Sequence, residues 1–168
     1  MRLRQDRRAP RRKLSPAAVA RSEARSLVVD LLGGAQPDCP LTDLGIVLGA
    51  GEIVWREVAL GLWSKPPGWA GWSRWGMVPC WLTSLRLVGR LPSGDLFGIG
   101  WGDVCGCVVE LEADRVILDG PDGSRYCLAG AAAPVVAVAA VAYLYGLDAL
   151  SSHPGLACLR GSDESSLG

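Results

Sequence analysis

A regular alternation of short apolar segments and turn signals between residues 78 and 145 constrains the fold of this chain most. The turns at 92–95, 112–114 and 120–123 are rich in Gly, Pro, Asp and Ser, residues typical of tight reversals. They separate six predicted strands, at 78–82, 86–91, 96–101, 107–111, 115–118 and 125–128. The pattern predicts an antiparallel β domain that ends in one helix over 131–145.

That helix lies within twenty residues, 128–147, that carry no charge, which is the length of a membrane span. Its content is mostly Ala and Val, Pro134 falls in the first turn, and Gly146 is a typical C-cap. The helix proper is then about fifteen residues, or about 22 Å, which is too short to cross a bilayer. A helix buried against the sheet is favoured, with a membrane span as the alternative.

The segment before the β domain divides into an arm, a helix and a linker. Residues 1–14 are Arg-rich and lack apolar periodicity, so they are expected to form a disordered basic arm. Ser15 and Pro16 open a predicted helix within 15–34, with apolar residues at helical spacing and a Gly-Gly end. A Pro-containing linker then runs to 43, the β domain covers 44–150, and 151–168 is a tail.

Charge is divided unevenly along the 168 residues. The whole chain has 17 basic and 17 acidic residues, yet residues 1–25 hold nine of the bases and two of the acids. The remaining body is therefore acidic, which disfavours a broad face for nucleic acid or anionic lipid. Residues 1–25 are the expected place for any peripheral contact with an anionic membrane or a nucleic acid.

Cysteine usage and the N-terminus indicate a cytoplasmic protein. The six cysteines have no zinc-knuckle spacing and are expected to be buried free thiols. The arginine pairs of the arm are not followed by an apolar run, so a secretion signal is not predicted. Arginine outnumbers lysine and Ala and Gly abound, which favours a bacterial source with a GC-rich genome.

The segment 65–76 is the strongest candidate for a binding site. It interleaves Trp69, Trp72 and Trp75 with Gly and Pro between Lys65 and Arg74, and it is predicted to be a loop. Exposed Trp and Arg are typical of protein-binding hot spots, and Trp also enters membrane interfaces. A third alternative is that the rings fold back and close the core.

The chain resembles the pleckstrin-homology-like superfold, and most closely its bacterial and GRAM-type members, over 44–147. The residues that carry the resemblance are the Gly-Glu pair at 51–52, the Trp-Leu-Thr-Ser-Leu-Arg-Leu segment at 81–87, the Ser-Gly turn at 93–94 and the Trp-Gly-Asp-Val segment at 101–104. The resemblance implies an α+β fold that is mostly β. Its expected form is a small bent antiparallel barrel or sandwich of about seven strands, capped by the C-terminal helix.

The resemblance also bears on ligands. Lys65 and Arg74 stand where phosphoinositide-binding relatives carry basic residues, but the neighbours of Arg74 are not basic, so inositol phosphate binding is not implied. Bacterial members of this superfold mostly lack such ligands. Arg86 is expected to pair with Asp103 or Glu52.

Motifs for nucleotide binding or nucleophilic catalysis are absent from the sequence, and the single histidine is His153. We therefore expect a non-catalytic interaction domain without metal, cofactor or small-molecule substrate. Its predicted role is to bind a protein partner through the Trp69/Trp72/Trp75 loop or an exposed sheet edge. The alternatives are membrane association and nucleic-acid attachment by the arm.

Overall fold

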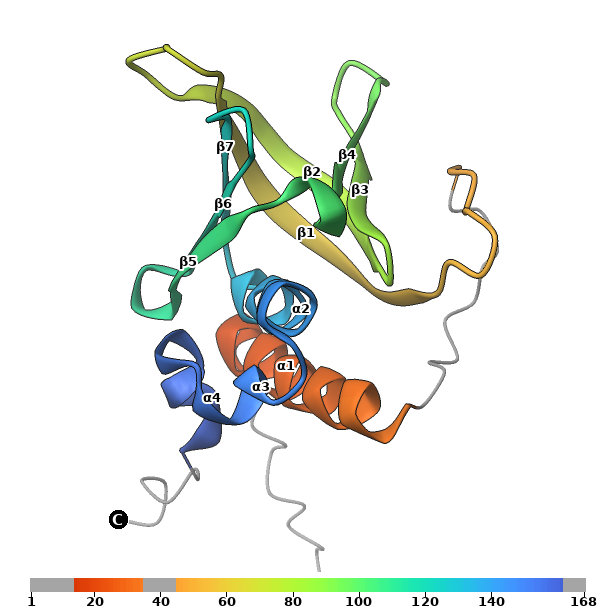
Figure 1. The fold of residues 1–168 in the computed structure, drawn as a ribbon, viewed down its shortest axis with the longest axis vertical. Helices are drawn as coiled ribbons and strands as arrows, with labels where there is room; N and C mark the ends of the chain where they lie inside the picture. Colours follow the sequence, from red (N-terminus) through yellow and green to blue (C-terminus); the bar gives the residue numbers. More distant parts are fainter. Residues whose placement is uncertain (1–13, 35–44, 162–168) are drawn as a thin grey trace, which may run out of the picture.

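A single seven-stranded antiparallel sheet forms one layer of the computed structural model, which describes residues 14–34 and 45–161 (Figure 1). The strands are β1 (Val54–Lys65), β2 (Ser73–Thr83), β3 (Arg86–Arg90), β4 (Leu96–Gly100), β5 (Gly106–Glu110), β6 (Arg115–Asp119) and β7 (Arg125–Ala129). Their order is β4-β3-β2-β1-β7-β6-β5. The α+β class and the seven strands are confirmed.

The predicted barrel or sandwich is instead one open sheet. No pairing joins β4 to β5, so these two strands are its edges. The long β1 joins the two halves, since it pairs with β2 along its length but with β7 only from Gly61 to Lys65. Register shifts between Val54 and Arg56 and between Leu62 and Trp63 bend this hairpin.

The uncharged stretch forms α2 (Ala133–Tyr145), a core helix between two layers. It packs on the β5–β6 half of the sheet on one side and on α1 (Pro16–Gly33) on the other (Figure 1). All ten residues from Ala133 to Ala142 are buried, which explains why no side of the helix is polar. Within the described residues, no helix is long and apolar enough to cross a membrane.

The helix α1 has the predicted ends and the predicted buried side. The Ser15 side chain accepts a hydrogen bond from the Ala18 amide at 3.2 Å, and Gly34 ends the helix with φ 62°. Ala20, Ala24 and Leu27 are buried. The disordered arm was predicted for 1–14, of which 1–13 lie outside the described residues, as does 35–44 of the linker.

Packed structure continues past residue 150, where the sequence placed the end of the β domain. Three short helices follow α2: α3 (Ala149–Ser152), η3 (Pro154–Leu156) and α4 (Ala157–Arg160). Leu150, Leu156 and Leu159 are buried among them. The Arg25 side chain of α1 donates to the Leu159 carbonyl at 3.0 Å, which ties α4 to α1.

Arg86 pairs with Glu52, one of its two expected partners. Its Nε donates to Glu52 Oε1 at 2.9 Å, and its Nη2 donates to Oε2 at 3.1 Å. The same carboxylate accepts from the Thr83 hydroxyl at 2.6 Å and from the Gly49 amide at 2.7 Å. Burial of Glu52 raises its pKa, but these donors outweigh burial, and the net pKa is lowered.

Candidate partner-binding surface

The β1–β2 hairpin presents two of the three predicted tryptophans to solvent. Its tip is shorter than the predicted loop of 65–76, because β1 continues to Lys65 and β2 already begins at Ser73. Trp69 is 63% exposed and Trp72 is 41% exposed. The tip extends away from the helices, at the upper left of Figure 1. Two large rings are therefore available to a partner.

Trp75 belongs to the core side of the hairpin and not to this surface. Its Nε1 donates to the Ser64 hydroxyl at 2.8 Å, and its ring meets Phe97 edge-on with centroids 6.3 Å apart. The sequence allowed that the Trp rings fold back and close the core. This is true of Trp75 but of neither Trp69 nor Trp72. Trp75 is half-buried, packs against the core and satisfies its N–H, so it helps to close the core.

Lys65 and Arg74 lie on the outer face of the hairpin, away from α2. Arg74 is opposite Trp63 in the β1–β2 register, and its guanidinium carbon lies 5.8 Å from the centre of the Trp63 ring. This distance is within the range of a cation–π interaction, which holds the exposed Arg74 beside the Trp63 ring. Lys65 follows two residues after Trp63 on β1, so it shares the same face.

An apolar row continues from Trp63 across four strands of this outer face. The register places Trp63 beside Cys127 of β7, Cys127 beside Ile117 of β6, and Ile117 beside Val108 of β5. Val108 is 40% exposed, and the other three are half-buried. Directly opposed side chains of adjacent strands lie about 5 Å apart, so the row is continuous.

We call the tip and the row together the hairpin surface. Its members are Trp63, Lys65, Trp69, Trp72, Arg74, Val108, Ile117 and Cys127. The helix α2 packs on the opposite face of the sheet, and α1 packs on α2 (Figure 1). Sequence reasoning found the tip but missed the row, because its members are spread over four strands and only the register brings them together.

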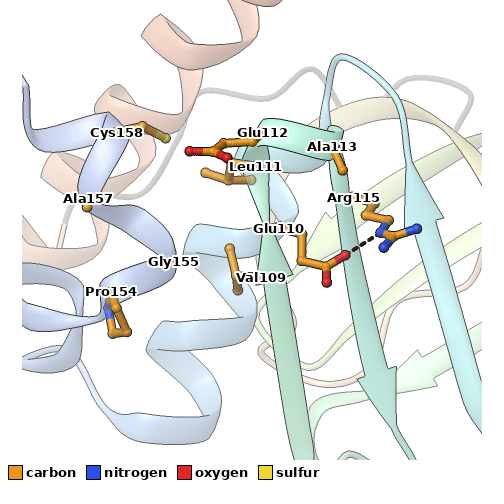
Figure 2. A pocket seen from close by; sticks show the side chains of 10 residues that line it. All are labelled: Val109, Glu110, Leu111, Glu112, Ala113, Arg115, Pro154, Gly155, Ala157 and Cys158. Carbon is orange, nitrogen blue, oxygen red and sulfur yellow. Dashed lines mark hydrogen bonds and ion pairs between the residues drawn. The ribbon is translucent and has the colours of Figure 1, made fainter.

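A cavity lies elsewhere, between the end of β5 and the C-terminal helices (Figure 2). Its volume is about 490 Å³, and its walls come from β5, η2 (Leu111–Ala113), β6, η3 and α4. Glu110 and Arg115 form an ion pair at its rim, while Glu112 and Cys158 lie at the same end of the pocket in Figure 2. Arg115 offsets Glu110 but Glu112 does not have a basic residue of its own in the lining, and the described residues hold no cluster of three His, Cys, Asp or Glu that would suit a metal ion.

The described cysteines are free thiols, but they are not uniformly buried as predicted. Cys80 is buried, and burial raises its pKa to about 12. Burial also raises the pKa of Cys107 and of Cys127, so these thiols stay protonated near neutral pH. Cys105 and Cys158 are exposed, and Cys39 lies outside the described residues.

Comparison of the sequence with protein-family models and with curated proteins finds no match. Function is therefore inferred from the fold and from the surfaces described above.

Proposed function

We propose that this chain is a non-catalytic, pleckstrin-homology-like interaction domain of a bacterial cytoplasm that binds a protein partner through the hairpin surface. One observation carries the proposal: the exposed Trp69 and Trp72 lie at the tip of the hairpin whose strand β1 supplies Trp63, the first member of an apolar row across the face of the sheet opposite to α2. Trp and Arg dominate the binding energy of many protein interfaces, where single residues contribute about 2 kcal/mol or more.

Two features of the fold support the pleckstrin-homology-like assignment. The sheet is antiparallel throughout and is followed by one apolar helix, as that resemblance implies. Glu52 and Arg86, which both lie in segments that carry the resemblance, bind each other with two hydrogen bonds.

The exposed rings of Trp69 and Trp72 leave apolar area in water, which is unfavourable in free energy unless a partner covers them. An aromatic side chain buries roughly 150–250 Å² when it is covered, and apolar burial contributes about 25 cal/mol per Å². Pro66 and Pro67 restrict the tip, so less conformational freedom is lost there when a partner binds. Trp63 and Arg74 hold each other at the base of the same surface.

Site-specific photocrosslinking in cells tests this proposal. A photoreactive amino acid replaces Trp69 or Trp72 in the full chain, and the control replaces Leu32, which is 59% exposed on α1. We expect a discrete protein adduct from positions 69 and 72 that position 32 does not give. The W69A/W72A variant should compete poorly for the same partner. Equal adducts from all three positions would contradict the proposal.

Membrane association is the second candidate, and the same tip favours it. Exposed Trp rings beside a Lys suit the interface of a bilayer. The crosslinking experiment separates the two candidates, because a tip in a bilayer gives lipid adducts from positions 69 and 72 instead of a protein adduct.

A further inference from the structure

The two edges of the open sheet are not equivalent, because β5 is covered. The Cys107 amide of β5 donates to the Tyr145 hydroxyl of α2 at 3.2 Å. η3 packs directly on the strand: a Cβ placed on Gly155 would lie 2.5 Å from the Val109 Cβ. Figure 2 shows Val109 between β5 and the turn at Gly155. Edge strands covered in this way are closed to further pairing.

Among the described residues, β4 is the other edge, with no further strand paired to it. The Leu91 amide donates to the Asp95 carbonyl at 2.8 Å, and the Trp101 amide donates to the Leu85 carbonyl at 3.0 Å. These bonds fix which residues of β4 face β3, since hydrogen-bonded and non-hydrogen-bonded pairs alternate in an antiparallel ladder. The even-numbered residues, Leu96, Gly98 and Gly100, therefore turn their N–H and C=O groups away from the sheet.

A groove of about 350 Å³ lies against this edge, between β4 and the turn that joins β6 to β7. Gly98, Ile99, Gly100 and Asp103 line one side, and Pro121, Asp122, Ser124 and Tyr126 line the other. The Asp103 carboxylate lies against Gly100, because a Cβ built there would be 2.6 Å from Asp103 Oδ2. Gly98 leaves the backbone of β4 open to close approach by another chain, since a Cβ built there has only the Leu87 carbonyl oxygen within 4 Å.

The groove is negatively charged. Asp103 and Asp122 line it and are exposed, and no Lys or Arg is among its lining residues. Asp122 accepts a hydrogen bond from the Ser124 amide at 2.9 Å, and bonds to Ser124 lower its pKa. The nearest base in sequence, Arg125, pairs with Asp119 at 2.6 Å.

We infer that this groove binds an extended segment of a partner protein that carries Arg or Lys, and that the segment adds to β4 as a further strand. The outward N–H and C=O groups of Gly98 and Gly100 supply the ladder, which is the usual mode of strand addition. Asp103 and Asp122 select basic side chains by charge. The groove shares no lining residue with the hairpin surface, although Lys65 is paired with Arg125 next to the groove residues Ser124 and Tyr126.

Peptide binding to the full chain tests the inference. The probe is a fluorescein-labelled octapeptide of alternating Arg and Thr, and its control alternates Glu and Thr. We expect saturable anisotropy changes with the Arg peptide only. Binding should be unaffected by W69A/W72A, which removes the proposed hairpin site and so separates the two proposals. Equal binding of both peptides would overturn the inference.

The strand ladder is tested by a matched pair at one position. Gly98→Pro removes the outward N–H without loss of a bond to β3, whereas Gly98→Ala keeps it, and a Cβ there meets only the Leu87 carbonyl oxygen at 4.0 Å. We expect Gly98→Pro to lower the affinity for the Arg peptide by about tenfold or more. Gly98→Ala should lower that affinity by less than about twofold. Equal affinities in folded variants would exclude strand addition.

The charge selection is tested by variants of equal net charge. Asp103→Asn/Asp122→Asn should lower the affinity for the Arg peptide about three- to tenfold. The control Glu57→Gln/Asp148→Asn changes two exposed acids that do not line the groove. It should change the affinity for the Arg peptide by less than about twofold. If both pairs weaken binding equally, the peptide binds the acidic body without a site, and the inference fails.

Amide hydrogen exchange gives a readout that needs no variant. The Gly98 and Gly100 amides should exchange fast in the free chain and slowly when the Arg peptide is bound. Unchanged exchange at saturating peptide would overturn the inference. If the full chain is already a dimer that Asp103→Asn/Asp122→Asn dissociates, a second copy occupies the groove, and a different partner protein is excluded.

Discussion

Among single residues, Glu52 is a buried carboxylate with several hydrogen-bond donors around it. Its side chain is 1% exposed and accepts hydrogen bonds from Arg86, Thr83 and Gly49. Glu52→Gln would replace one accepting oxygen by an NH₂ group that faces donors. We expect a loss of about 2–3 kcal/mol in the free energy of unfolding at pH 7, somewhat below a fully buried pair because Arg86 is 34% exposed. Urea denaturation measures it.

The same variant makes a prediction about pH. The folded pKa of Glu52 is lowered, so its contribution is complete above the unfolded value of about 4.3 and is lost as pH falls through the folded pKa. The gap between wild type and Glu52→Gln should therefore narrow in acid. Glu112→Gln, at an exposed position, should change stability by less than about 0.5 kcal/mol at either pH. A gap that persists unchanged in acid would show that the carboxylate charge is not the cause.

Among the elements, the α1–α2 pair joins the N-terminal helix to the core. Leu27 is fully buried in the cluster that includes α2, whereas Val29 of the same helix is 68% exposed. Leu27→Ala should lower the free energy of unfolding by about 2–5 kcal/mol because it leaves a cavity. Val29→Ala should change it by less than about 0.5 kcal/mol. Equal effects in urea denaturation would mean that α1 does not contribute to the core.

The helices also show where sequence reasoning stops. Spacing and caps were enough to place α1 and its buried side, because those signals are local. Because α2 is apolar all round, the sequence was compatible with both a core helix and a membrane span. The pattern does not indicate what covers the helix, and in the structure α1 and the sheet cover it. At the hairpin, three tryptophans of equal spacing differ in exposure because Trp75 lies within β2, where its N–H reaches Ser64. The apolar row from Trp63 to Val108 depends on strand register, which no local pattern specifies.

For the whole molecule, charge separates along the chain. Residues 1–13 contain seven Lys or Arg and one Asp, while the acidic body lies beyond residue 25. The arm is thus the expected place of electrostatic attraction to an anionic surface, whereas the hairpin surface offers mainly apolar contact. Peripheral binding by the arm and protein binding by the hairpin are therefore expected to respond to different variants.

Vesicle sedimentation of the full chain tests the arm. We expect binding to phosphatidylglycerol vesicles at about 0.05 M salt and release at about 0.5 M, because exposed charges are screened over a few ångströms there. Each basic residue near such a surface contributes about 1 kcal/mol, so replacing Arg7, Arg8, Arg11 and Arg12 by Gln should remove nearly all binding. The control W69A/W72A should sediment like wild type. If instead that control stays in the supernatant and salt releases nothing from wild type, the hairpin tip inserts into the bilayer, and both the arm prediction and the protein-binding proposal fail.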